Sequence, residues 1–434
     1  MISYFQNIRN NILIKIGSFN SIGVLVTSLV GVVSVKVIAI SLGAEGMALI
    51  GNLRNFLSTI QSVGTLGLYN GVVKYVSEHK NNKRELATML STSYYVCFVV
   101  TMILAAWLYY DPGFWNDLIF GKQYNFNFIF KAAGIALPFY CANIMSLAII
   151  NGFSKYKVFI VLNIVTSIAG LFITILLIWQ YDLSGAFYAI VINPAISLLI
   201  TLVLILNQKN FAKFLLANQI TFQYIKRLSS YSVMALVSAL VLPLILIKIR
   251  NFIIFNEGVD QAGFWEAIRR ISDQYMVFVT TLISLYLLPK LAEIKTSKGF
   301  KEEIFNFYRI ILPIFIVGFI IIYILKDTII LLLFSENFMA MKPLFIWQLS
   351  GDLLRIIAIT LACQLLAKRM FWPYIVTEIL SFSVLYFSSL YLIKRFGFVG
   401  ASMAHFFNYL IYLIMLIILF RKKIFSNKEK QVLS

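Results

Sequence analysis

The amino-acid sequence predicts an all-α integral membrane protein with twelve transmembrane helices, arranged as two parallel six-helix repeats. Of the 434 residues, 60% are hydrophobic and only 13% are charged, whereas a soluble domain has about 45–50% apolar and about 25% charged residues. Twelve apolar stretches are long enough to cross a bilayer, and related segments recur in both halves of the chain. The composition excludes a soluble enzyme, a secreted disulfide scaffold and a disordered chain.

Twelve stretches supply the roughly 20 largely apolar residues that a spanning helix needs. The first six lie near residues 17–42, 47–77, 87–110, 128–152, 158–180 and 184–206. The second six lie near residues 228–256, 263–289, 303–326, 343–366, 371–393 and 398–420. Prolines inside several of them predict kinks, because membrane helices tolerate proline. The short apolar stretch 328–334 is expected to be the outer end of the ninth span or a re-entrant turn.

Basic residues are distributed unequally between the loops. If Lys74 and Lys326, which end their spans, are counted with the adjoining loops, the N-terminus, the even-numbered loops and the C-terminus hold 23 Lys and Arg residues, whereas the odd-numbered loops hold 5. The positive-inside rule therefore places both termini in the cytoplasm. Cytoplasmic loops also account for the net charge of +19, so nucleic acid is not expected as a partner.

Cysteine and histidine are too few and too scattered for a metal site or a disulfide framework. Cys97, Cys141 and Cys363 lie in apolar stretches without motif spacing, and the only histidines are His79 and His405. We therefore expect no metal and no cofactor. The first apolar run lacks a small-residue cleavage site, so it is predicted to be a retained span and not a removed signal peptide.

Charged residues also fall inside the predicted spans. A central charge costs about 2.5–3.5 kcal/mol on the insertion scale, so most of these side chains must face a protein interior or a wet cavity. The basic residues in this group are Lys36, Arg54, Lys131, Lys248, Arg250, Arg269, Arg270, Arg309 and Arg355. The acidic ones are Glu266, Asp273, Asp352 and Glu378.

An internal repeat relates the two halves. "LGAEGMALIGNLRNF" resembles "VDQAGFWEAIRRISDQY", with Gly46 and Gly263 related by an offset of 217 in the numbering, and a second related pair of segments has Gly185 and Gly400 at an offset of 215. Six spans is an even number, so the two copies point the same way across the membrane. The predicted domains are an N-terminal six-helix lobe, residues 1–210, and a C-terminal six-helix lobe, residues 211–434.

The repeat places basic residues at equivalent depths in both halves. Arg54 matches Arg270 at an offset of 216, and Lys36 lies near Lys248 and Arg250 at offsets of 212 and 214. All of these except Arg270 lack an acidic neighbour in sequence. Because a buried cation needs an anion, which a ligand can supply, we predict that they line one chamber for an anionic substrate.

Local ion pairs offer a second interpretation of spans eight and ten. Glu266 and Asp273 each lie within four residues of two arginines, and Asp352 lies three residues from Arg355. Helical pairs at this spacing can serve the structure alone. Glu378 has no local partner, which leaves it as either a proton site or an acid that pairs across helices.

Five stretches together resemble a known family of transporters. They are "LGAEGMALIGNLRNF", "GLYNGVVKYVSEH", "ISDQYMVFVTTLISLYLLPKLAEI", "LFIWQLSGDLLR" and "VTEILSF". In this order they resemble the lipid-linked oligosaccharide flippases of the Wzx type, which move O-antigen or enterobacterial common antigen units. That family belongs to the multidrug/oligosaccharidyl-lipid/polysaccharide exporter superfamily. The resemblance covers nearly the whole chain.

The resemblance implies a V-shaped, two-lobed bundle around a central cavity in the bacterial inner membrane. Its substrate would be an undecaprenyl-pyrophosphate-linked oligosaccharide, moved from the cytoplasmic to the periplasmic leaflet. A polysaccharide polymerase and a chain-length regulator would be partners. The substrate-binding positions would be Lys36, Arg54, Lys248 and Arg250, with Arg270. Further cavity positions, or candidates for coupling to a gradient, are Asp273, Asp352, Arg355 and Glu378.

Two other functions are alternatives to a flippase. A cation-coupled multidrug exporter of the same superfamily would have an acidic cavity, which the excess of basic residues in the spans disfavours. A membrane polysaccharide polymerase would need a large periplasmic loop with catalytic groups, and no odd-numbered loop is that long. With no ATP site or catalytic constellation visible, the chain is not expected to be an enzyme.

Overall fold

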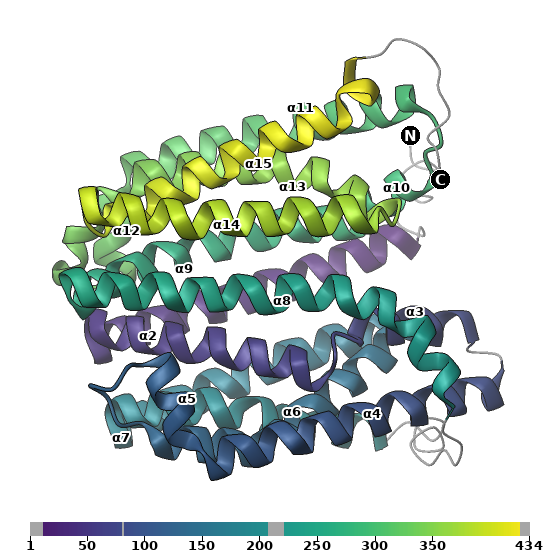
Figure 1. Ribbon diagram of the computed structural model, residues 1–434, viewed down its shortest axis with the longest axis horizontal. Coiled ribbons are helices and arrows are strands. Elements are labelled where there is room, and N and C mark those ends of the chain that lie inside the picture. Colours follow the sequence, from purple (N-terminus) through teal and green to yellow (C-terminus); the bar gives the residue numbers. More distant parts are fainter. Residues whose placement is uncertain (1–11, 80–81, 207–220, 426–434) are drawn as a thin grey trace, which may run out of the picture. The chain divides into compact units, whose positions relative to one another are not determined.

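The computed structural model describes residues 12–79, 82–206 and 221–425, and every regular element in these ranges is helical (Figure 1). Ten of the described helices are long and apolar enough to cross a membrane. The predicted class of all-α membrane protein is thereby confirmed.

The chain forms two compact units. One consists of Met1–Val37 and Asn52–Leu244, and the other of Ile38–Gly51 and Ile245–Ser434. Helices α2 and α8 therefore each contribute to both units. The predicted domain boundary after residue 210 lies outside the described residues, so that division stays a prediction.

Six helices that precede α8 belong wholly or mainly to the first unit, which also includes the part of α8 up to Leu244. They are α2 (Ile12–Gly64), α3 (Tyr69–His79), α4 (Lys83–Tyr110), α5 (Pro112–Ile119), α6 (Asn127–Gly152) and α7 (Tyr156–Leu206). Within this unit α6 packs against both α4 and α7. The short helix α5 begins at Pro112, whose fixed backbone angle favours the first turn of a helix.

The second unit holds the rest of the chain. Its elements are α8 (Phe222–Glu257, from residue 245), α9 (Val259–Leu282), the π-helical turn η2 (Ile283–Leu287), α10 (Leu288–Glu293), α11 (Ser297–Ile324), α12 (Lys326–Leu333), the 3-10 turn η3 (Glu336–Met341), α13 (Leu344–Ala367), α14 (Phe371–Phe396) and α15 (Val399–Phe425). Helix α15 packs against α13 and α14, as Figure 1 also shows. The apolar stretch 328–334, expected at the end of a span or in a re-entrant turn, belongs to the separate short helix α12.

Two of the long helices are interrupted where the sequence predicts short loops. Helix α2 contains a non-helical residue at Gly43, with φ 64° and ψ −163°, and α7 contains one at Asp182, with φ 47° and ψ −126°. Glycine adopts positive φ without steric cost, and aspartate does so more readily than most residues. Each of these elements therefore consists of two helices joined at a bend.

Three positions of positive φ in the first half of the chain recur in the second half. Ser154 and Arg369, which follow α6 and α13, are related by an offset of 215, and so are Asp182 and Gly397. Gly43 has its counterpart at Gly258, between α8 and α9, at the same offset. Helix ends thus recur at the offset seen between related sequence segments, which supports the predicted internal repeat.

One pair of glycines performs the same packing role in both halves. A Cβ atom on Gly185 would lie 1.8 Å from the carbonyl oxygen of Leu177, and one on Gly400 would lie 2.3 Å from that of Leu392. Gly185 and Gly400 are separated by 215 positions, and so are Leu177 and Leu392, which is the same offset that relates the helix ends. Since the obstructing atoms are backbone, no rotamer change can make room for a methyl group.

We expect Gly185→Ala and Gly400→Ala each to lower the free energy of unfolding by about 1–3 kcal/mol, because overpacking forces the backbone to shift. Chemical unfolding in mixed micelles measures this. Gly318→Ala is the matched control, since its Cβ would meet nothing within 4 Å. Equal stability of all three variants would contradict the packing role.

Candidate functional site

A carboxylate surrounded by three arginines lies at the start of α9. Glu266 is buried, and Arg269 and Arg270 follow it by three and four residues, which places all three on one helical face. Arg270 Nη2 lies 2.7 Å from Glu266 Oε1, and Arg269 Nη1 lies 3.6 Å from Oε2. Arg250 of α8 donates to Oε2 across the two helices.

This cluster (Arg250, Glu266, Arg269 and Arg270) carries a net charge of +2, from three guanidinium groups and one carboxylate. Arg250 is fully buried, whereas the side chains of Arg269 and Arg270 retain 21% and 19% of their exposure. Arg250 therefore neutralises Glu266 internally. The two arginines on α9 keep donors available for an anion.

Aromatic and glycine residues hold the cluster in place. The guanidinium carbons of Arg250 and Arg269 lie 5.5 and 5.1 Å from the ring centroid of Trp265, within cation–π range. On the facing segment of α2, a Cβ at Gly51 would lie 2.7 Å from Glu266 Cδ and 2.9 Å from Arg250 Cζ. Glycine at position 51 thus permits the backbone of α2 to approach the buried ion pair.

A second polar cluster surrounds Asp352 of α13, which is fully buried. Its Oδ2 accepts hydrogen bonds from Ser272 Oγ at 2.6 Å, from the hydroxyl of Tyr275, and from Gln348 Nε2 at 3.2 Å. Its Oδ1 lies 2.9 Å from His405 Nε2 of α15 and 3.9 Å from Arg355 Nη1. Donors from three helices therefore compensate the desolvation of this carboxylate.

Helix α9 connects the two clusters. Arg269 of the first and Ser272 of the second are three residues apart, about one helical turn. A displacement of α9 would therefore shift the positions of Arg269 and Arg270 and at the same time alter the hydrogen bonds to Asp352.

The structure brings together some of the residues predicted to bind substrate. Arg250 and Arg270 meet at Glu266, while Lys248 is exposed two residues before Arg250 on α8. These three belong to the second unit. Lys36 and Arg54, both half-buried, belong to the first.

The acidic positions also find partners. Asp273 acts electrostatically on Arg355, and Glu378 of α14 accepts a hydrogen bond of 3.0 Å from the hydroxyl of Tyr412. The acid that had no neighbour in sequence thus pairs across helices. Within the described part of the chain, no group of three His, Cys, Asp or Glu residues could hold a metal ion.

Sequence reasoning missed three contributors to the Asp352 cluster. Ser272 and Tyr275 lie on α9, and His405 lies on α15. A lone histidine within a predicted span was the one available signal. Gln348, by contrast, lies four residues before Asp352, so the helical period already places the two on one face.

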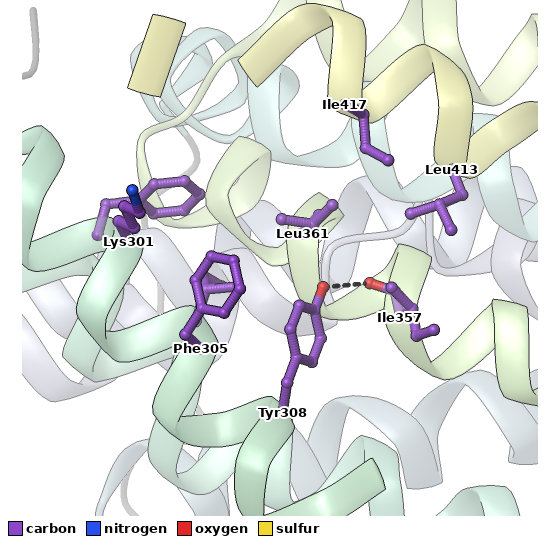
Figure 2. Close-up of a pocket in the computed structure, with 9 residues that line it drawn as sticks. Lys301, Phe305, Tyr308, Ile357, Leu361, Leu413 and Ile417 are labelled. Carbon is purple, nitrogen blue, oxygen red and sulfur yellow. Dashed lines mark hydrogen bonds between the residues drawn. The ribbon is translucent and has the colours of Figure 1, made fainter. Parts of the chain in front are cut away.

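An apolar pocket of about 210 Å³ lies between α11, α13 and α15 (Figure 2). Apart from Lys301 and Tyr308 its lining is hydrophobic, and the hydroxyl of Tyr308 donates to the carbonyl of Ile357 at 2.8 Å. Such a lining suits an apolar chain and not a multiply charged group. The arginine cluster is therefore the stronger candidate for recognising an anion.

Comparison with known proteins establishes the family. Residues 13–295 match the family described as "Polysaccharide biosynthesis protein". The chain belongs to this family. A curated relative of this polysaccharide biosynthesis protein, the Lipid III flippase of Escherichia coli (strain K12), is 26% identical over 390 residues, covering 87% of this chain and 90% of the relative. The resemblance inferred from the five sequence stretches is thereby confirmed.

Solved structures show the same fold. A multidrug resistance MATE family transporter of the MOP superfamily, in an inward-facing conformation, has a TM-score of 0.73 with 11% identity, over 93% of this chain and 96% of that chain. Lipid II flippase MurJ, in an inward closed conformation, has a TM-score of 0.71 with 12% identity, over 92% and 87%. The chain is thus a multi-pass membrane protein with the fold of these two membrane proteins.

Glu266→Gln should destabilise the protein strongly, because it removes the one carboxylate among three cations. Breaking a buried pair from one side costs about 3–5 kcal/mol. The double variant Arg250→Met/Glu266→Gln, which removes the buried charge on both helices, should recover part of the loss. Chemical unfolding in mixed micelles measures both variants, and a Glu266→Gln protein as stable as wild type would refute the pairing.

Proposed function

We propose that this protein is a flippase that moves an undecaprenyl-pyrophosphate-linked oligosaccharide from the cytoplasmic to the periplasmic leaflet of the bacterial inner membrane. The observation that carries the proposal is the arginine cluster, which bears net positive charge on partly exposed donors within a membrane-spanning helix. The family match and the flippase relative support the same substrate class. The glycan would be an O-antigen or enterobacterial common antigen repeat unit.

The chemistry of the headgroup fits this cluster. A pyrophosphate carries at least two negative charges and cannot enter hydrocarbon without replacing its hydration. Guanidinium groups bind phosphate oxygens with two parallel N–H donors and stay charged when partly desolvated. Arg269 and Arg270 would contact the headgroup, while the buried Arg250 would position Glu266 and thereby both arginines. Lys36, Arg54 and Lys248 would add cationic contacts elsewhere along the path.

The bends in α2 and α7 support the finer architecture. Since each of these elements contains two helices, we infer twelve spans from ten candidates, arranged as two six-helix repeats. Transport would proceed by alternating access around a central cavity between two lobes, as the resemblance implies. The distribution of Lys and Arg between loops supports cytoplasmic termini. A polymerase and a chain-length regulator would act on the exported units.

The membrane potential can supply part of the energy. Moving one negative charge outward from a negative interior is favourable by about 2.3 kcal/mol per 100 mV. A cation-coupled multidrug exporter is the alternative function, because the fold also occurs in such a transporter. Net positive charge on the arginine cluster disfavours it, since cationic drugs require acidic contacts.

Translocation in proteoliposomes tests the proposal. We expect Arg269→Gln and Arg270→Gln each to slow the flipping of undecaprenyl-pyrophosphate glycan by about tenfold or more, because each removes a charge-assisted contact worth about 1.5–3 kcal/mol. A membrane-impermeant glycosidase reports the glycan that reaches the outer leaflet. Arg395→Gln, whose side chain lies over the ring of Tyr391 at the end of α14, is the control and should leave the rate unchanged.

Arg54→Ala and Lys248→Ala should each abolish glycan export in cells while leaving expression intact, since both lose a cation predicted to contact substrate. Surface glycan and membrane-fraction blots measure the two effects. Full export by the double variant Arg54→Ala/Lys248→Ala would show that neither residue is needed for transport of the glycan. Cation-driven dye efflux without any protein-dependent glycan movement would favour the multidrug exporter.

A further inference from the structure

Two positively charged or protonatable groups compete for one oxygen of Asp352. His405 Nε2 lies 2.9 Å from Oδ1, and Arg355 Nη1 lies 3.9 Å from the same atom. The shorter contact is a full hydrogen bond, whereas the longer one is an ion pair without one. Arg355 instead has its guanidinium 5.8 Å from the ring centroid of Tyr409. Asp352 therefore has two alternative cationic partners and engages one of them closely.

The nitrogen that binds the second proton of His405 can be assigned. An ionised carboxylate only accepts hydrogen bonds, so Nε2 carries a hydrogen in either charge state, and Nδ1 is the atom that gains or loses a proton. The imidazole keeps 17% of its exposure. It is therefore not sealed from proton exchange, unlike the carboxylate that it contacts.

The backbone of α13 is shaped to admit this ring. A Cβ on Gly351 would lie 2.5 Å from His405 Cδ2 and 3.1 Å from the backbone of Phe406. Any larger residue at position 351 would push the imidazole of His405 away from the carboxylate of the neighbouring residue, Asp352.

The first half of the chain shows that the fold does not require this polar pair. At the constant offset that relates the helix ends, Asp352 corresponds to Leu137 and His405 to Ile190. Leu137 is fully buried. Apolar residues thus fill these positions in one repeat, so the charged pair in the other calls for a role beyond packing.

The charged surroundings of His405 come from three of the helices packed against α15. Helix α9 contributes Tyr275 and Asp273, and α13 contributes Arg355. Helix α14 contributes Glu378, which Tyr412 of α15 engages. Helix α11 also packs on α15. Its Tyr308 hydroxyl donates to the carbonyl of Ile357, and among the described residues no hydrogen bond or ion pair joins a titratable group of α11 to His405.

The ring of Tyr409, one turn beyond His405 on α15, lies against the imidazole with centroids 4.9 Å apart. The guanidinium of Arg355 lies 5.8 Å from the centroid of the same ring. Tyr409 therefore contacts both of the groups that can pair with Asp352 Oδ1.

We propose that His405 is the proton-binding site of this transporter and that proton release transfers Asp352 Oδ1 from His405 to Arg355. The imidazolium donates a charge-assisted bond, which is about twice as strong as that of the neutral ring. When Nδ1 loses its proton to water, the neutral imidazole is a weaker donor to Asp352 Oδ1 and no longer outcompetes Arg355 for this oxygen. Arg355 then moves from Tyr409 onto the carboxylate.

This exchange reaches the substrate through α9. Ser272 and Tyr275 donate to the other oxygen of Asp352, and Arg269 lies about one turn before Ser272 on the same helix. The inference rests on the proposed function, because the anion at Arg269 and Arg270 is the ligand to which the proton is coupled. By linkage, the anion and the proton must change each other's affinity by the same factor.

Nuclear magnetic resonance of labelled histidine tests the proton site without any transport. The chain has two histidines, so the signal lost in His405→Gln identifies the ring. Spectra recorded from pH 5 to 9 in lipid nanodiscs should show a pH-dependent change in that signal, and inorganic pyrophosphate should change this pH dependence. His79, whose Nε2 lies 3.3 Å from Glu85 Oε2 in the first unit, serves as the internal control, since pyrophosphate should not affect its signal. A His405 signal that stays constant from pH 5 to 9 would overturn the proposal.

Translocation under a pH gradient tests the coupling. Wild-type and His79→Gln proteins should change their initial flipping rate at least fivefold with the gradient, whereas His405→Gln, which keeps an amide donor for Asp352, should change less than twofold. An undiminished gradient response in His405→Gln would overturn the coupling. If no variant flips glycan, the proposed function fails while the titration still decides whether His405 binds the proton.

Discussion

The energetic cost of placing charge inside a membrane governs this protein. Helix α9 carries charges that could not face lipid, and the structure resolves this by burying Glu266 against Arg250 and by leaving Arg269 and Arg270 partly exposed. One carboxylate thus compensates one guanidinium inside the protein and orients two others. The result is a site whose excess positive charge is held by packing, by Trp265 and by the close approach of Gly51.

The same constraint explains the Asp352 cluster. A carboxylate without exposure needs donors, and α9, α13 and α15 each supply at least one. The two clusters share α9 as a common support. The proposed anion site and the proposed proton site are therefore connected through one helix within one unit.

The two repeats share a backbone pattern and differ in their polar residues. Gly185 and Gly400 admit equivalent backbone atoms, and positive φ recurs at a constant offset. Yet Leu137 and Ile190 stand where the other repeat has Asp352 and His405. The shared pattern serves the fold, and the difference coincides with the proposed proton site.

The sequence by itself determined the membrane class, most of the span positions and the internal repeat. These follow from composition, apolar length and fixed offsets, which are properties of the chain before it folds. It also placed Glu266 beside Arg269 and Arg270, and Gln348 beside Asp352, because helical neighbours lie three or four residues apart. The stretch 328–334 forms most of the short helix α12, which follows α11 directly, because apolarity alone does not show where one helix ends and the next begins.

Only the tertiary structure decided which helices face each other. Arg250 had no acidic neighbour along its own helix, but Glu266, 16 residues later, meets it across α8 and α9. Asp352 likewise meets Ser272, 80 residues away, and His405, 53 residues away. The physical reason is that helical periodicity sets the face on which a side chain lies, whereas the partner across that face depends on how separate helices pack.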